Sequence, residues 1–395
     1  MISGTGAPRP SVLILGAFGT FGRLITDTLA RSTDLQIIAA GRHLPEVRPD
    51  FRSDISTLAI DSNDLSAALL EKLGPAVVID AAGPFQTRDR NLAKACILLG
   101  IHYLDLADGR EFVQNVSALD AAALARKVLI VSGASTLPAL SSAVIEDLAG
   151  AFSEVEEIDI GIAPGYSGPR GLATIRSVLG YVGRAIPVWR QAKMGRARGW
   201  SDTRRHRYPP PVGRRNLSLI DVPDTSLLPL RYPTLRQLSI RAGHEVALVH
   251  HALRLLGVLV RIGLIGNLAG HARMMQRAAG WFEPFGSDKG AMHVRLRGRG
   301  RDGASQSRTW TLVAENGDGP RIPTLAAVLL TKKLLHVPGY DPMLLRGAAP
   351  ASGLLTLREF EHEWRSLAIR TCVSGEACAQ ASGNLVATAS SHRAT

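Results

Sequence analysis

The first third of the chain alternates short apolar runs with stretches of helical periodicity. Residues 12–15 are all apolar, and Leu24, Ile25 and Leu29 then fall at helical spacing. Five more strand-like runs follow at residues 36–40, 57–60, 76–80, 102–106 and 127–132, with helix-like stretches such as 64–73 and 91–99 between them. This alternation predicts a doubly wound parallel sheet over residues 1–150.

A glycine-rich turn joins the first strand to the first helix. Glycine can form the tight turn at position 16, allow a pyrophosphate to approach at position 19, and permit close helix packing at position 22. The alternative is a glycine-rich turn without a ligand. The order of strand, turn and helix favours a Rossmann dinucleotide-binding domain. The residues expected to contact the cofactor here are Gly16, Phe18, Gly19, Thr20, Phe21 and Gly22.

The residue after the second strand indicates which dinucleotide binds. NAD-binding proteins usually place a carboxylate there, whereas this chain has Arg42, which favours a 2′-phosphate and therefore NADP. The alternative for Arg42 is a solvated surface residue. Asp61, after the third strand, is expected either to meet the adenine edge or to cap the helix beginning near residue 64, and we weigh the two equally. Ala82 and Gly83 are small enough to let the dinucleotide lie against the sheet edge.

The second half has a different pattern. Residues 158–162 alternate between apolar and small or polar, a further strand is expected at 238–241, and two alternating runs at 291–297 and 308–315 flank a turn-rich segment. Together with a helix at 323–336, they predict a mixed sheet backed by helices. The expected fold class is α/β: an N-terminal Rossmann domain at 1–150 and a second, α+β domain at 151–370. Residues 371–395 lack periodicity and are expected to form a flexible tail.

Three segments carry a family resemblance. Residues 16–22, 80–85 and 96–105 together resemble the NADP-binding domain of the saccharopine dehydrogenase-like oxidoreductases, over about residues 11–150. The resemblance implies a substrate held between the two domains and a hydride moved to or from the nicotinamide. Family members act on amino-acid imines, and others are lipid-linked enoyl reductases.

The end of the fifth strand carries the candidate catalytic residues. The resemblance implies an acidic residue near position 109, but this chain has Gly109, so that role falls to Asp108 or Glu111. Hydride addition to a C=N or C=O bond leaves charge on the heteroatom, and a nearby proton donor is therefore useful. Asp105 and Asp108 are the candidates. The alternatives are a buried structural acceptor for Asp105 and a turn former for Asp108.

Charge and cysteine content limit the class of partner. The net charge of +12 is carried mainly by arginine, which fits an anionic surface or, equally, a biased base composition of the genome. Residues 184–215 are expected to form an arginine-rich loop that meets an anionic ligand or lipid surface, or is simply solvated; nucleic acid is not expected. Three cysteines suggest neither a disulfide framework nor a metal site. With no signal-peptide core, a cytoplasmic location is expected.

Residues 246–269 form the most apolar long stretch. Arg254 and Arg261 interrupt it, so no transmembrane span is expected. An amphipathic helix is predicted whose apolar face packs inside the protein or in a homodimer interface, with a peripheral membrane contact as the alternative.

These observations predict an NADP-dependent oxidoreductase with an unidentified small-molecule substrate that is acidic, an imine or lipid-like. The alternative is an NADP-binding sensor or structural module without turnover, located at the membrane periphery.

Overall fold

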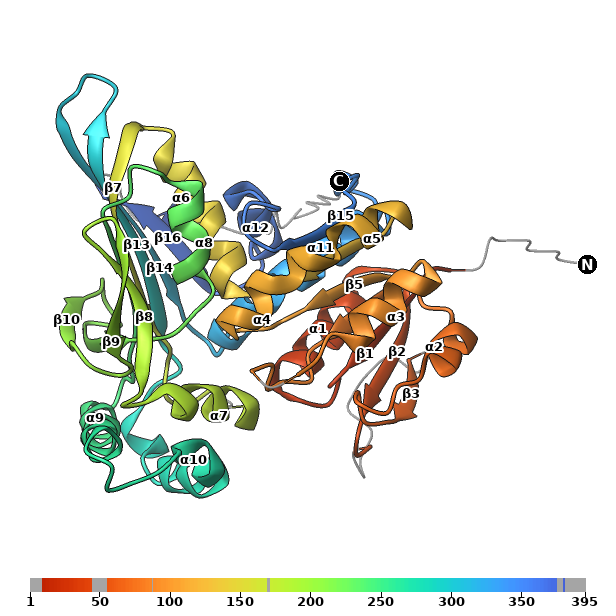
Figure 1. Ribbon diagram of the computed structural model, residues 1–395, viewed down its shortest axis with the longest axis horizontal. Helices are drawn as coiled ribbons and strands as arrows, with labels where there is room; N and C mark the ends of the chain where they lie inside the picture. Colours follow the sequence, from red (N-terminus) through yellow and green to blue (C-terminus); the bar gives the residue numbers. More distant parts are fainter. Residues whose placement is uncertain (1–8, 45–54, 87, 169–170, 375–378, 381–395) are drawn as a thin grey trace, which may run out of the picture.

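The computed structural model describes residues 9–44, 55–86, 88–168, 171–374 and 379–380. Two β-sheets dominate it, one built mainly by the first third of the chain and the other by the remainder (Figure 1).

The first sheet is parallel throughout and has the strand order β15-β6-β5-β4-β1-β2-β3. Six of its strands match the predicted ones, so the doubly wound sheet is confirmed. The strands are β1 (Ser11–Leu15), β2 (Gln36–Gly41), β3 (Ser56–Ala59), β4 (Val77–Asp80), β5 (His102–Asp105), β6 (Leu129–Ser132) and β15 (Gly347–Pro350). The seventh strand, β15, returns from the far end of the chain. The range 151–370 therefore includes one strand of the first sheet.

Helices cover both faces of this sheet because the strands are apolar on both sides. Helices α2 (Ala67–Leu73), α3 (Asn91–Leu99) and α5 (Asp120–Ala125) contribute buried side chains to one face. Helix α1 (Thr20–Ser32) covers the other with Ile25 and Leu29. Helix α2 begins later than predicted, because Ser66 caps it by accepting from the Leu69 N–H.

The second sheet is mixed, as predicted. Its order is β10-β11-β12-β7-β13-β14-β16-β17, and β8 pairs with β12 and β9. Strands β7 and β12 run parallel, while the β13–β14 pair forms the predicted antiparallel hairpin. The strands first named here are β7 (Phe152–Ala163), β8 (Ala185–Arg190), β9 (Lys193–Arg198), β10 (Arg204–Arg207), β11 (Arg214–Leu219), β12 (Gln237–Ala242), β13 (Gly290–Gly300), β14 (Ser305–Ala314), β16 (Ile369–Val373) and β17 (Ala379–Gln380).

The arginine-rich segment is not a loop, contrary to the prediction. It forms two antiparallel hairpins, β8 (Ala185–Arg190) with β9 (Lys193–Arg198) and β10 (Arg204–Arg207) with β11 (Arg214–Leu219). Ile186 and Val188 alternate along β8 and are buried in a small apolar cluster with Leu219, which anchors the first hairpin to β11.

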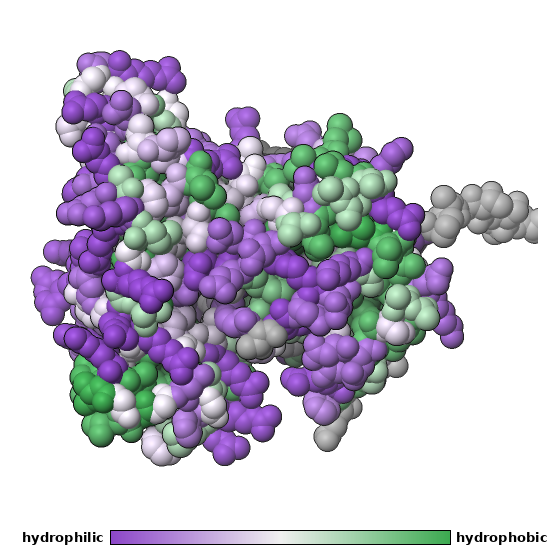
Figure 2. Space-filling view, viewed as in Figure 1, coloured by the Kyte–Doolittle hydropathy of each residue, from purple (hydrophilic) through white to green (hydrophobic). Residues whose placement is uncertain are grey.

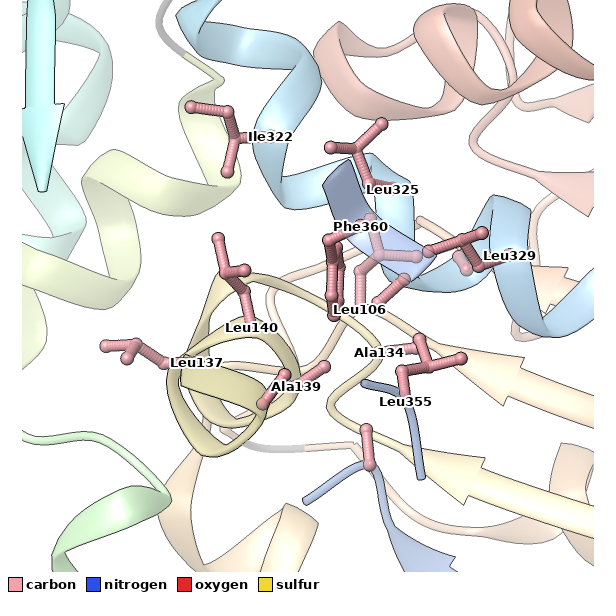
Figure 3. Close-up of a cluster of buried hydrophobic side chains, with 14 of the residues drawn as sticks. Leu106, Ala134, Leu137, Ala139, Leu140, Ile322, Leu325, Leu329, Leu355 and Phe360 are labelled. Carbon is pink, nitrogen blue, oxygen red and sulfur yellow. The ribbon is translucent and has the colours of Figure 1, made fainter. Parts of the chain in front are cut away.

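One helix expected to back the second sheet lies elsewhere. Helix α11 (Leu325–Leu334) packs against α1 and against α12 (Leu357–Glu363). Leu325 and Leu329 on α11 meet Leu106 after β5 and Phe360 of α12 in one cluster (Figure 3). The hydrophobic core therefore runs without a break from the first sheet into the second.

The predicted amphipathic helix forms as α9 (Ala247–Arg261), followed by α10 (Ala272–Gly280). Its face bearing Leu248, Leu255 and Val258 is exposed, so the prediction that this face packs inside the protein is wrong for these residues. Cover by a second subunit stays a prediction. No helix in the described ranges is long and apolar enough to cross a membrane.

The first residues of the expected tail belong to a strand, contrary to the prediction. Strand β16 runs to Val373 against β14, Cys372 is disulfide-bonded, and β17 follows. Residues 375–378 and 381–395, where the rest of the tail falls, lie outside the described residues.

Candidate functional site

The glycine turn after β1 is closely packed on one side and open on the other. Gly16 has φ +73°, and a Cβ there would lie 2.9 Å from the Ala81 carbonyl oxygen. A Cβ on Gly22 would lie 2.1 Å from the Gly16 carbonyl oxygen. Gly19 is exposed, and a Cβ there would meet only that same oxygen, at 3.2 Å. Positions 16 and 22 thus need glycine because the turn's own backbone lies too close for a side chain. Gly19 instead leaves space on the open, solvent-facing side of the turn.

The N-terminus of α1 is available to an anion. Gly19 is the N-cap, no side chain caps the helix, and its first turn contains no acidic residue. The first N–H groups of a helix have no partner within the helix and carry its positive dipole end. The open side of Gly19 together with these donors fits a dinucleotide pyrophosphate. Phe18 packs beside this turn, where a Cβ on Gly41 would lie 2.7 Å from its ring, and Thr20 and Phe21 begin the helix.

Arg42 and Asp61 face each other at the ends of β2 and β3. Arg42 Nε lies 3.9 Å from Asp61 Oδ2, and the Arg42 side chain is 70% exposed. Asp61 Oδ1 accepts from the Asn63 N–H at 2.9 Å, so this carboxylate stabilises a turn rather than capping α2. The guanidinium is therefore accessible to a phosphate, in competition with one nearby carboxylate.

A pocket of about 210 Å³ lies beside Asp61, between the turn after β3 and the start of α3. Arg88 spans its wall: Nη1 donates to Asp80 Oδ2 at 2.7 Å, and Nη2 donates to Ser62 Oγ at 3.1 Å. Burial disfavours the charged form of Arg88, but Asp80, Tyr103 and Asp105 together outweigh burial and the pKa of Arg88 is raised. The hydrogen bond to Ser62 ties the loop after β4 to the turn after β3. Sequence reasoning did not identify Arg88, because no local motif marks its contacts with Asp80 and Ser62.

Asp105 is fully buried at the end of β5. Its Oδ1 accepts from Ser132 Oγ and from the Gly133 and Ala107 N–H groups, at 2.8 to 3.0 Å. Its Oδ2 is buried without a hydrogen-bond partner. Burial raises the pKa of Asp105 to about 6, although the two backbone donors oppose the shift. This carboxyl therefore joins the ends of β5 and β6.

Asp108 lies where the first sheet meets helix α7 (Leu172–Tyr181). Its Oδ1 accepts from Gln86 Nε2 at 2.9 Å, and the same nitrogen donates to Ser177 Oγ on α7 at 2.6 Å. Burial raises the pKa of Asp108, although its hydrogen bonds with Ser177 and Gln86 oppose the shift. Burial also raises the pKa of Tyr181, and Asp108 adds to that shift. Neither Gln86 nor Ser177 had a local sequence signal.

The charged residues next to Asp108 are Arg110 and Glu111. Arg110 Nε donates to Asp221 Oδ1 at 2.9 Å and Arg110 Nη2 donates to Glu111, whose side chain is 79% exposed. Of the two acids that could replace the missing one at position 109, Glu111 points to solvent and Asp108 lies in the junction.

Helix α7 reaches the cofactor region as well. A Cβ on its N-cap Gly171 would lie 3.4 Å from Thr20 Oγ1 in the glycine turn, and a Cβ on Gly83 would lie 3.3 Å from Ala173 Cβ. Ala82 and Gly83 therefore lie on the same side of the sheet as the turn. The predicted cofactor residues and Asp108 meet along one edge, and Asp105 lies beneath it.

Comparisons with known proteins agree with this geometry. Residues 12–144 match the family model described as the saccharopine dehydrogenase NADP binding domain. No curated protein matches the sequence. Among solved structures, apo saccharopine dehydrogenase (L-Glu forming) from Saccharomyces cerevisiae is similar with a TM-score of 0.63 and 14% identity, covering 93% of this chain and 100% of that one. Homospermidine synthase from Legionella pneumophila, solved with NAD, is similar with a TM-score of 0.58 and 11% identity. That match covers 93% of this chain and 91% of the synthase chain.

The two solved structures share the fold of the whole chain, and the family model covers its first domain. Residues 12–144 are thus similar to the NADP-binding domain of saccharopine dehydrogenase, which supports NADP as the cofactor of the first domain.

Proposed function

We propose that this chain transfers a hydride between NADP(H) and the C=N or C=O group of a small substrate held between the first sheet and helix α7. The observation that carries the proposal is the position of Asp108. It follows a strand of the dinucleotide-binding sheet, yet its hydrogen-bond network reaches Ser177 on an element of the second domain. Substrates of dehydrogenases with this architecture bind at the carboxyl edge of the sheet.

The chain's own residues have distinct tasks in this proposal. The α1 N-terminus binds the pyrophosphate, and Arg42 binds the 2′-phosphate. When bound, NADPH supplies the hydride. Gly171 and Ala173 of α7 cover the edge between the glycine turn and Gly83, which excludes water from the reacting atoms.

Asp108 is the proton donor in this scheme. Hydride addition places negative charge on the substrate nitrogen or oxygen, and a carboxyl that keeps its proton to higher pH can donate to that atom. Burial raises the pKa of Asp108 in the direction that this role requires. Gln86 holds the carboxyl from one side and α7 limits its movement from the other. Asp105 is a positioning residue, because its Oδ1 accepts hydrogen bonds from Ser132 and Gly133 and so holds the end of β6 beside β5.

Turnover of NADPH tests the proposal. The full chain is mixed with NADPH and a panel of 2-oxo acids, each alone and with a primary amine, and formation of NADP⁺ is followed by absorbance. We expect at least one pair to be reduced, and Asp108→Asn to lower kcat while NADPH affinity is unchanged. Glu111→Gln is the matched control, since this acid lies three positions away and faces solvent. Tight NADPH binding without any hydride transfer would favour a cofactor-binding sensor instead.

A further inference from the structure

The helical unit after β12 exposes a group of large apolar side chains. It comprises α9, η3 (Leu268–His271), α10 and η4 (Glu283–Phe285), and Figure 2 shows apolar side chains gathered at the lower left, over α9. We name this surface the α9–α10 face. Its large apolar side chains are 47% to 78% exposed: Leu248, Leu255, Val258, Ile262, Leu264, Met274, Trp281 and Phe285.

The α9–α10 face is separate from the side of α9 that builds the core. His250, Leu253 and Gly257 are buried on that inner side. Leu248, Leu255 and Ile262 repeat at intervals of seven residues, so they share the outer side. The helix is therefore apolar on two sides, although only one of them has a partner within the described residues. Large exposed apolar surfaces of this kind mark interaction sites.

Positive charge accompanies the apolar side chains. Residues 246–285 contain four arginines and one glutamate, a net charge of +3. Arg254 directly precedes Leu255, and Arg261, the last residue of α9, directly precedes Ile262. One position corresponds to about 100° around a helix, so both arginines flank the apolar stripe. Both arginines of α10, Arg273 and Arg277, are also exposed.

We propose that the α9–α10 face docks on an anionic lipid bilayer. The apolar stripe enters the boundary between headgroups and acyl chains, while the flanking arginines reach back to the lipid phosphates. Trp281 and Phe285 are the most exposed aromatic residues of the face, and tryptophan is favoured at the headgroup level of membranes. Each arginine near the surface adds electrostatic attraction to anionic lipid.

The charge distribution favours a bilayer over a second copy of the chain. In a twofold interface the same patch meets itself, so the arginines of both copies would be brought together with a single glutamate on each side. A surface of lipid phosphates neutralises them instead. The inner sides of α10 and η3 pack against α7. The proposal does not depend on the proposed function, since it uses no residue of the cofactor site.

Cosedimentation with vesicles tests the proposal. The full chain is mixed with vesicles of phosphatidylcholine alone, or of phosphatidylcholine and phosphatidylglycerol in equal parts. We expect binding only to the anionic vesicles, and its loss as salt shortens the screening length from about 10 Å at 0.1 M to about 3 Å at 1 M. A blue shift of tryptophan emission should accompany binding and disappear in Trp281→Phe.

Two double variants separate the apolar and charged contributions. Leu255→Ser with Ile262→Ser should weaken vesicle binding about ten-fold or more, because burial of one such side chain contributes about a power of ten in affinity. Arg254→Gln with Arg261→Gln should abolish the preference for anionic lipid. The matched control for the apolar variant is Leu98→Ser with Leu124→Ser, exposed apolar residues of the first sheet's helices. The matched control for the charge variant is Arg358→Gln with Arg365→Gln, exposed arginines at the start of α12 and just after it. NADPH binding reports that each variant is folded.

Unchanged vesicle binding in both α9 variants would overturn the proposal. So would a parent chain that ignores anionic vesicles and forms a dimer that Leu255→Ser with Ile262→Ser dissociates, since a second copy would then cover the face.

Discussion

The side-chain amide of Gln86 donates a hydrogen bond of 2.6 Å to Ser177 Oγ, and so joins the loop after β4 to helix α7. The same nitrogen donates to Asp108 after β5. Three segments that are distant in sequence therefore meet at one atom. The position of the Asp108 carboxyl thus depends on the second domain as well as on the first.

Arg42→Ala should weaken NADPH binding and leave NADH binding nearly unchanged. Hydrogen bonds to charged groups contribute about 1.5 to 3 kcal/mol, so the dissociation constant for NADPH should rise about ten-fold or more. Fluorescence titration with both cofactors measures this. Equal losses for the two would show that Arg42 does not bind the 2′-phosphate.

Asp61→Asn tests whether this carboxylate contacts the adenine or competes with a phosphate for Arg42. Asp61 Oδ2 lies 3.9 Å from Arg42 Nε and competes with a phosphate for the guanidinium. Removing its charge should leave NADPH binding equal or tighter, in the same titration. A weaker affinity for both NADPH and NADH would instead indicate a direct contact with the adenine.

Gly19→Val and Gly22→Ala should fail in different ways. Valine at position 19 projects into the open side of the turn, so binding of both cofactors should be lost while the melting temperature is kept. Alanine at position 22 would place its Cβ 2.1 Å from the Gly16 carbonyl oxygen, so the melting temperature itself should fall. Calorimetry and titration on both variants separate the outcomes. Normal cofactor binding by Gly19→Val would contradict the role of the turn.

The pH dependence of kcat should report Asp108. Because burial raises the pKa of Asp108, the carboxyl keeps its proton above the pH at which an ordinary aspartate loses it, and loses the proton as the pH rises further. A reduction that needs this proton should slow as the pH rises through that pKa. In Asp108→Asn this limb should disappear, whereas Glu111→Gln should keep it. An unchanged limb in the asparagine variant would exclude Asp108 as the proton donor.

Asp105 should make the fold less stable as the pH rises. Its pKa is raised from 3.8 to about 6, so the folded state binds the proton more tightly than the unfolded chain, and the free energy of unfolding falls between these pH values. In Asp105→Asn, Oδ1 still accepts from Ser132 and Gly133 without a charge to bury. Thermal unfolding at several pH values should show this variant gaining stability over the parent as the pH rises through about 6. Asp105→Ala should lose stability at every pH.

Local patterns in the sequence determined the first domain. Apolar runs, helical spacing and the glycine turn are properties of residues close together in the chain, so the six strands and the α1 N-terminus could be predicted from them. The β13–β14 hairpin was predictable for the same reason, since its turn lies between two alternating runs.

Tertiary structure decided where distant segments lie. Strand β15 joins β6 from 215 positions away, counting from Ser132 to Gly347, and no local periodicity marks such a partner. Packing also decided which side of α9 is covered, because periodicity shows that a helix has an apolar face without showing what covers it. The Gln86–Ser177 contact spans 91 positions and depends on how α7 packs over the sheet edge. The sequence by itself determined the dinucleotide-binding scaffold, whereas the surroundings of Asp108 depended on the assembly of both sheets. Side chains far apart in the chain become neighbours only when the core between the sheets has formed.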